Sequence, residues 1–292
     1  MRRRFGPLLS AALLSLGALV AVAADAKVPG APAKKVAPQS IGAPNAGRLE
    51  NGAHLLESPV IRYVGGYVGD SHYGVRELVE GIDRAAHEVK RRYPDAVLGV
   101  GQLSRKDGGE IDRHHSHESG RDGDLLFYLV DPLGKAVAHD RFYTIGPDGR
   151  ALSDRSLRFD DGRNWALISA LVNDPRMRVT HIFVVQYLRT RLLAYGARVG
   201  ASPALRQRIA EVLMQPRHAL PHDDHFHVRI ACPWTSSKCV ENAISHVATK
   251  KPTEQGMKTV KIKTKNKPPR APIKRLVRAR STGKAKPPGT TI

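Results

Sequence analysis

The sequence predicts an α+β fold, in which helices pack on a small, mainly antiparallel sheet. Three observations support this class: one long segment with the apolar spacing of an amphipathic helix, short apolar runs of strand character between further helical segments, and too few such runs for a large sheet. A hydrophobic content of 41% over 292 residues is sufficient for a core. This content excludes a wholly disordered chain.

The strongest helical pattern lies in the first half of the chain. Apolar residues in Tyr73–Tyr93 recur at spacings of three and four, and Pro94 ends the pattern. The segment Ser58–Val64 before it is expected to be extended. The apolar runs Ala96–Leu103 and Gly123–Val130 that follow are predicted to be strands.

The second half mixes helices and strands. Ser202 and Pro203 are typical of an N-cap followed by the first helical position, and they begin one of these helices. The elements expected here are a helix at Asp161–Val172, a strand at Val179–Val185, a helix at Leu188–Arg198, a helix from Pro203 to Met214, and a strand at His225–Ile230.

The net charge of +20 is concentrated at the two ends of the chain. Met1–Arg4 contains three arginines, and Lys250–Ile292 contains 14 Lys or Arg residues and one acid. The residues between these segments are close to charge balance. The basic character therefore describes the ends, and the aromatic content of 5% is low for a protein that works by stacking bases.

Four segments follow from this composition. Residues 1–26 join an arginine cluster, a short apolar run and small residues, which is typical of a cleaved signal peptide, with an uncleaved membrane anchor as the alternative. Residues 27–46 are expected to be an Ala/Pro/Lys-rich linker, 47–246 the folded domain, and 247–292 a basic disordered tail. We expect an exported protein, periplasmic or secreted. Its tail is either simply solvated or binds an anionic cell-wall or membrane surface, and no nucleic acid is required.

Export would place the two cysteines in an oxidising compartment. Cys232 and Cys239 flank a turn-rich hexapeptide, so a short disulfide loop is expected, with free thiols as the alternative. Two cysteines exclude a four-thiolate zinc site.

Six of the 13 histidines lie in two short clusters. In the first cluster, His117 and Asp124 are seven residues apart, which is roughly 10 Å on a helix. That distance is too long for two ligands of one zinc ion, each about 2 Å from the metal. A turn permitted by Gly120 and Gly123 would bring them together, and Asp124 would then lie where an apolar strand begins.

The second cluster places His225 and His227 two residues apart. In a strand this spacing puts both imidazoles on one face, so that one can hold a metal while the other contacts a water bound to it. Three protein ligands and one open position are the pattern of catalytic zinc. A purely structural zinc would not require the additional histidines. We therefore predict one zinc ion per chain, at the strand mouths.

Together the two motifs, His117-x6-Asp124 and His225-x-His227, resemble those of the lysostaphin, D-Ala-D-Ala metallopeptidase and hedgehog group. Within this group the chain is most similar to penicillin-insensitive murein endopeptidases, over roughly Ser40–Glu241. The additional similarities are an upstream His114, the run from His222 to His227, the segments Ser40–Gly42 and Gly101–Ser104, and Val228-Arg229 with Cys232-Pro233.

The resemblance implies zinc on His117, Asp124 and His227, and His225 as the general base. His222 and His114 would line the site to orient the base or stabilise the transition state. The implied reaction is hydrolysis of the D-alanyl-meso-diaminopimelyl cross-link of peptidoglycan by a zinc-activated water.

Some features of the site are left open by this resemblance. Asp122 and Asp223 are candidate partners for imidazole N–H groups. His115 has no counterpart in the motif and is expected to be exposed.

Other activities share the same motifs. A D-Ala-D-Ala carboxypeptidase and an LD-endopeptidase would use the same metal ligands, so the sequence does not separate them from a DD-endopeptidase. A non-catalytic, zinc-containing wall-binding protein is the alternative from another class, although the chain contains every histidine that the mechanism needs. A further alternative is a polyanion-binding protein in which the tail carries the function.

Overall fold

The computed structural model describes residues 36–64, 70–112, 114–216 and 219–242. The predicted signal peptide, residues 27–35 of the predicted linker and the predicted tail lie outside these residues. The described residues contain helices and mainly antiparallel sheets, which confirms the α+β class. The helices are α1 (Arg76–Arg92), α2 (Asp161–Asn173), α3 (Gln186–Arg198) and α4 (Pro203–Val212).

The main sheet has six strands in the order β12-β11-β13-β7-β6-β4. The pairs β11·β13, β13·β7 and β7·β6 are antiparallel, and the two outer pairs are parallel. Its strands are β4 (Ile61–Tyr63), β6 (Leu98–Val100), β7 (Asp122–Leu126), β11 (Val179–Phe183), β12 (Leu213–Met214) and β13 (His225–Ile230). The last strand in the sequence, β13, is therefore in the middle of the sheet.

Three smaller sheets surround the main one. Two of them are two-stranded, β1 with β2 and β3 with β5, and the third has the order β10-β8-β9. Their strands are β1 (Gln39–Ala43), β2 (Ala46–Glu50), β3 (Ala53–His54), β5 (Tyr73–Gly74), β8 (Leu129–Val130), β9 (Ala136–Val137) and β10 (Arg158–Phe159).

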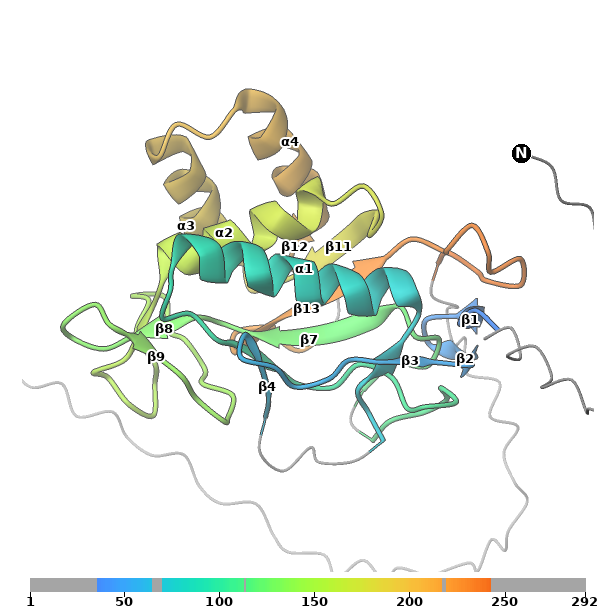
Figure 1. Ribbon diagram of the computed structural model, residues 1–292. Coiled ribbons are helices and arrows are strands. Elements are labelled where there is room, and N and C mark those ends of the chain that lie inside the picture. The colour runs from blue at the N-terminus through green and yellow to red at the C-terminus, as the bar shows by residue number, and fades with distance from the viewer. Residues whose placement is uncertain (1–35, 65–69, 113, 217–218, 243–292) are drawn as a thin grey trace, which may run out of the picture. The chain divides into compact units, whose positions relative to one another are not determined.

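One face of the main sheet is covered by helices. Figure 1 shows α1 lying along β7 and β13, with α2, α3 and α4 grouped beside it. The buried residues of α1 include the apolar positions from which the helix was predicted, such as Leu78, Ile82 and Val89. They join Phe226 and Val228 of β13 in one apolar core. This burial, more than helix propensity, stabilises the layer.

Five predicted elements had different bounds in the structure, and pairing with a neighbouring strand explains two of them. The helix expected from Tyr73 begins at Arg76, because Tyr73 and Gly74 pair with β3. The helix expected to reach Met214 ends at Val212, because Leu213 and Met214 pair with β11.

The other three corrections concern strands. The extended segment Ser58–Val64 contains only the three-residue strand β4, and Ala96–Leu103 contains only β6. The apolar run Gly123–Val130 forms two strands of different sheets, β7 and β8. Between them, the side-chain amide of Asn164 bonds both backbone groups of Tyr128, at 2.9 and 2.8 Å. This bonding replaces a continuous strand ladder.

The N-terminal hairpin changes the expected domain boundary. Strand β1 lies within the range 27–46 that composition assigned to a linker. The backbone N–H of Ser40 donates to Ser236 Oγ at 3.0 Å, and that of Gly42 donates to the Lys238 carbonyl at 2.9 Å. The folded unit therefore includes residues from Gln39 onward.

The segment after β13 is fixed by a disulfide and by hydrogen bonds from Arg121. Cys232 and Cys239 form the expected disulfide, with their Cα atoms 5.7 Å apart. The fully buried guanidinium of Arg121 donates to the backbone carbonyls of Ile230 and Val240, at 3.0 and 2.7 Å. These bonds fix the end of β13 next to the start of β7.

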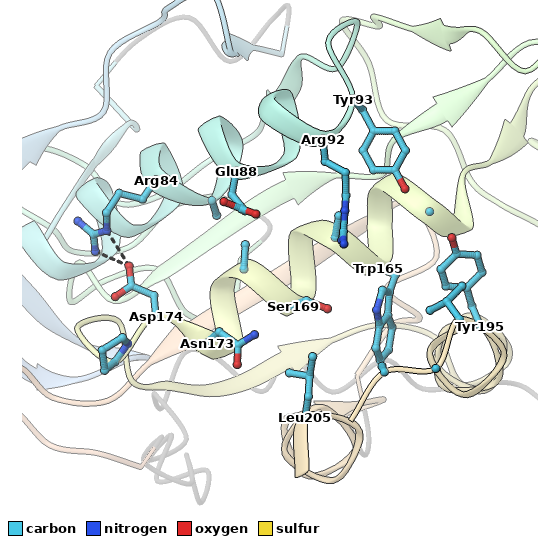
Figure 2. Close-up of a pocket in the computed structure, with 18 of the residues that line it drawn as sticks. Arg84, Glu88, Arg92, Tyr93, Trp165, Ser169, Asn173, Asp174, Tyr195 and Leu205 are labelled. Carbon is cyan, nitrogen blue, oxygen red and sulfur yellow. Dashed lines mark hydrogen bonds and ion pairs between the residues drawn. The ribbon is translucent and has the colours of Figure 1, made fainter. Parts of the chain in front are cut away.

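A cavity of about 860 Å³ lies among the helices (Figure 2). Arg84 of α1 and Asp174 form an ion pair of 2.6 Å at one end, and Tyr93 and Tyr195 lie at the other. Trp165 and Ser169 of α2 line it between these ends. None of the predicted site residues lines this cavity. Among the described residues, no helix has the length and apolar character needed to cross a membrane.

Candidate metal centre

The pairing of β13 with β7 brings the two predicted motifs together. His227 lies directly opposite Asp124, and Arg229 lies opposite Asp122. Successive strand residues point to opposite faces, so these four side chains share the face away from the α1 core. Phe226 of β13 points into that core. The sequence alternation at His225-Phe226-His227 thus separates a polar site from an apolar interior.

The loop before β7 brings His117 to the same place. His117 has a backbone φ of 73°, and Gly120 has one of 76°, so both adopt the left-handed conformation. This conformation is uncommon for a histidine and often occurs at functional sites. Gly120 makes the turn as predicted, but Gly123 lies inside β7.

Backbone contacts fix the orientation of the His117 ring. Its Nδ1 lies 2.7 Å from the carbonyl oxygen of Leu103, which directs Nε2 toward Asp124. The hydroxyl of Ser104 accepts the N–H of Gly120 at 2.9 Å and donates to the His117 carbonyl. Two residues of the Gly101–Ser104 segment therefore hold the first motif.

Asp124 is the centre of the cluster. Its Oδ1 lies 3.3 Å from His117 Nε2, 3.4 Å from His227 Nδ1 and 3.4 Å from His225 Nε2. Its Oδ2 lies 3.8 Å from His114 Nδ1. His222 completes the group, with its ring centroid 5.2 Å from that of His225. All six predicted site residues are thus adjacent.

Two carboxylates hold the imidazoles of β13. Asp122 Oδ1 lies 2.8 Å from His227 Nε2, which leaves Nδ1 of that ring directed at Asp124. Asp224 Oδ1 lies 2.5 Å from His225 Nδ1. The predicted partner role of Asp122 agrees with this geometry. Among the described residues, the carboxylate of Asp223 has no hydrogen bond to either ring; its backbone carbonyl accepts the N–H of Ile145 at 2.8 Å.

The separations measured from Asp124 fit those between ligands of one zinc ion, and His114, His117 and Asp124 form one of two groups of side chains that could hold a metal, the other being His222, His225 and His227. Bonds of about 2.0–2.2 Å at tetrahedral angles place ligand atoms roughly 3.3–3.5 Å apart. The separations from Asp124 Oδ1 to His117 Nε2 and to His227 Nδ1 are 3.3 and 3.4 Å. His117 Nε2 and Asp124 Oδ1 are also buried without a hydrogen-bond partner, a costly state that a bound cation would relieve.

Comparison with known proteins agrees with this site. The chain matches the penicillin-insensitive murein endopeptidase family over residues 40–280, a range that includes both histidine motifs. The chain belongs to this family. A penicillin-insensitive murein endopeptidase of Haemophilus influenzae is 28% identical over 180 residues, which are 59% of this chain and 56% of that protein. The chain therefore spans just over half the length of this relative.

In this member of the murein endopeptidase family, the site opens into a cleft of about 740 Å³. His114, His222, His225 and His227 line it, and His115 is exposed at its edge, as expected. On the other side of the cluster, a side chain at Gly101 would meet Phe142 at 2.8 Å and the Asp124 Cβ at 3.2 Å. Glycine at this position leaves room for both.

The side chains of the cluster differ in the direction in which their pKa values are shifted. Burial and the neighbouring imidazoles lower the pKa of His222 to about 3 and that of His114 to about 4, so both rings are neutral. Burial also acts on His225, but Asp124 and Asp224 outweigh it and raise its pKa to about 10. Burial would raise the pKa of Asp124, yet His117 and His225 hold it well below its usual range. A permanent carboxylate thus lies among nitrogen donors.

Proposed function

We propose that this protein is a zinc-dependent murein DD-endopeptidase that hydrolyses the D-alanyl-meso-diaminopimelyl cross-link of peptidoglycan. The observation that carries the proposal is the convergence of His117, Asp124 and His227 at ligand spacing beside an additional, carboxylate-held histidine. Membership of the murein endopeptidase family supports peptidoglycan as the substrate. Because that polymer lies outside the cytoplasm, we place the protein in the periplasm or the medium, as the predicted signal peptide also suggests.

His117, Asp124 and His227 would hold the zinc ion. Zinc bound there would supply Lewis acidity at the scissile carbonyl and lower the pKa of a water molecule. Asp122 influences the zinc ligands by holding the ring of His227. It accepts the Nε2–H of that ring and so keeps the Nδ1 lone pair available for the metal.

His225 serves as the general base. Asp224 accepts its Nδ1–H, so its Nε2, which lies 3.4 Å from Asp124 Oδ1, is directed at the metal site and would take a proton from the attacking water. The same nitrogen then delivers that proton to the leaving amine as the C–N bond breaks. Asp124 is the main charge that raises the pKa of His225 against burial. If Asp124 binds the metal ion, its charge would raise the pKa of His225 less. That pKa would then move back toward the range that a base requires.

His222 and His114 line the cleft on either side of the ligand set. Both are neutral, so each can donate one N–H to a substrate oxygen without placing a second positive charge beside the metal. We assign them to orienting the scissile amide and stabilising the charge that develops on its oxygen.

Cross-linked muropeptides test this function. The purified protein is incubated with them, with and without a chelator, and the products are resolved by mass. We expect chelator-sensitive conversion of dimers to monomers, restored by added zinc. Dimers that persist in the presence of zinc would contradict the proposal.

The same experiment separates the alternatives. Loss of one alanine from monomers would indicate a D-Ala-D-Ala carboxypeptidase, and cleavage at the L-centre of diaminopimelate would indicate an LD-endopeptidase. Retention of muropeptides on the protein without any cleavage would favour a wall-binding protein. Binding that is lost only when residues 247–292 are removed would assign that function to the tail.

A further inference from the structure

One cationic side chain lies in the wall of the cleft beside the proposed metal ligands. Arg229 is on the same face of β13 as His225 and His227, and it lines the cleft with them. Only 9% of its surface is exposed. On β11, His181 lies opposite Arg229 and Phe183 lies opposite His227. Arg229 is therefore one strand repeat, about 7 Å, from the residue proposed to hold the metal.

The contacts of Arg229 use only one edge of its guanidinium. Its Nε donates to Asp122 Oδ1 at 2.6 Å, and the guanidinium carbon lies 5.6 Å from the centre of the Phe183 ring. Among the described residues, no hydrogen bond is found for its two Nη groups. Neither Nη atom is fully buried, so each keeps some exposed surface. Asp122 and Phe183 thus hold the side chain while the Nη edge remains available.

This edge is suited to a carboxylate. The paired N–H groups of a guanidinium match the two oxygens of a carboxylate in a bidentate arrangement, which gives both attraction and directional selectivity. The imidazoles that line the cleft among the described residues all belong to the metal cluster except that of His115. An anion bound at Arg229 would lie within about one residue of an amide carbonyl held at the metal.

We propose that Arg229 binds the carboxylate that the substrate carries next to the scissile nitrogen, and so selects the residue on the amine side of the bond. This inference rests on the proposed function. In the D-alanyl-meso-diaminopimelyl cross-link, the carbon attached to the scissile nitrogen bears a free carboxylate. A peptide bond inside a continuous chain lacks this group, because its carboxyl is used in the next amide. Arg229 would thus distinguish cross-links from ordinary peptide bonds.

Two matched substrates test this role. One is a cross-linked muropeptide with the free carboxylate next to the scissile nitrogen, and the other is the same molecule with that group converted to a carboxamide. A charge-assisted pair is expected to favour the carboxylate form by about 10- to 100-fold in kcat/KM. The difference should lie mainly in KM, because the carboxylate is bound equally before and during the reaction.

The variants Arg229→Gln and Arg229→Lys are compared with His181→Gln as the neighbouring control. We expect Arg229→Gln to bring the ratio close to one, Arg229→Lys to give an intermediate ratio, and His181→Gln to keep the wild-type ratio. Since each ratio is measured within one protein, a general loss of zinc or stability does not imitate the effect. Zinc content is measured on each variant as well.

A preference that persists in Arg229→Gln, or a wild type that treats both substrates alike, would overturn the inference. If the wild type cleaves neither substrate, the proposed function fails, and the Kd of each compound is measured by calorimetry on the same proteins. The ratio of the two Kd values then decides the role of Arg229 independently of cleavage.

Discussion

The two faces of β13 differ in how their side chains are satisfied. On the α1 side, Phe226 and Val228 are fully buried, and the Phe226 ring packs 4.7 Å from that of Phe127. On the other side, the hydrogen bonds found for the His227 and Arg229 side chains both go to Asp122. His227 Nδ1 lies 3.4 Å from Asp124 Oδ1, and this buried oxygen has no hydrogen-bond partner. One face is complete by itself. The polar face leaves donors and acceptors available to a ligand.

The helical cavity provides a second contrast. Its volume of about 860 Å³ is larger than the 740 Å³ of the histidine cleft. Arg84 and Arg176 nevertheless both pair with Asp174 there, at 2.6 and 3.5 Å. Size alone therefore does not identify a site, whereas groups left unpaired at ligand spacing do.

The largest effects should come from the histidines of the polar face. His117→Ala removes a ligand held by the Leu103 carbonyl, so we expect loss of both zinc and muropeptide cleavage. His225→Ala removes the base but no proposed ligand. It should keep zinc while its kcat falls about 10²- to 10⁴-fold. Metal analysis and cleavage rates on both variants check this division, and equal zinc loss in the two would contradict it.

Truncation on the apolar face should affect stability instead. Phe226→Ala leaves a cavity among aromatic rings and is expected to lower the free energy of unfolding by about 3–5 kcal/mol. Phe226→Leu is the milder control. Urea denaturation measures the loss, and zinc titration of the folded protein should give an unchanged Kd. A weakened zinc site at unchanged stability would show that the two faces are not separate.

The carboxylate behind His227 should have an intermediate effect. Asp122→Asn keeps the shape of the side chain but removes the charge that His227 and Arg229 share, so the affinity for zinc should fall about 10- to 100-fold. Asp223→Asn is the matched control, because its carboxylate bonds neither ring. Competition with a chromophoric chelator measures both, and the prediction fails if the two variants bind zinc equally.

The smallest effect is expected among the helices. Burial would raise the pKa of Asp174, but its bonds with the Arg176 N–H and with Arg84 lower it. A lowered carboxyl pKa stabilises the fold above the unfolded value of about 4 and is lost as pH falls through the folded value. Asp174→Asn should therefore lower the free energy of unfolding by up to about 1 kcal/mol at pH 7 and by nothing near pH 2. Denaturation at both pH values checks this, with Glu88→Gln as an exposed control.

Local pattern predicted the elements well and their ends poorly. The spacing of Leu78, Ile82 and Val89 identified α1, but its start depended on the pairing of Tyr73 with a distant strand. The hairpin of β1 was missed because Ala, Pro and Lys near it dominate the composition. Besides its pairing with β2, β1 contacts residues almost 200 positions later, such as Ser236. Such pairings leave no periodic signal.

For the site, too, the local motifs were predictable and the distant contacts were not. Both histidine motifs were recognised because metal ligands depend on side-chain type and spacing, and the register of β13 with β7 then placed them together. The Leu103 carbonyl that orients His117 was not predictable, since a backbone oxygen has no sequence signature. Asp223 and Asp224 are adjacent, and only the backbone conformation decides which carboxylate reaches His225.

The central position of β13 has a consequence for the order of assembly. Ribosomes make the chain from its N-terminus, so β7 and β11 exist before the strand that must lie between them. Until that strand arrives, β7 and β11 each have an unpaired edge, and the cluster lacks His225 and His227, two of its five histidines. No chain that ends before β13 therefore contains the whole zinc site, and hydrolytic competence can arise only after almost the entire domain has been synthesised.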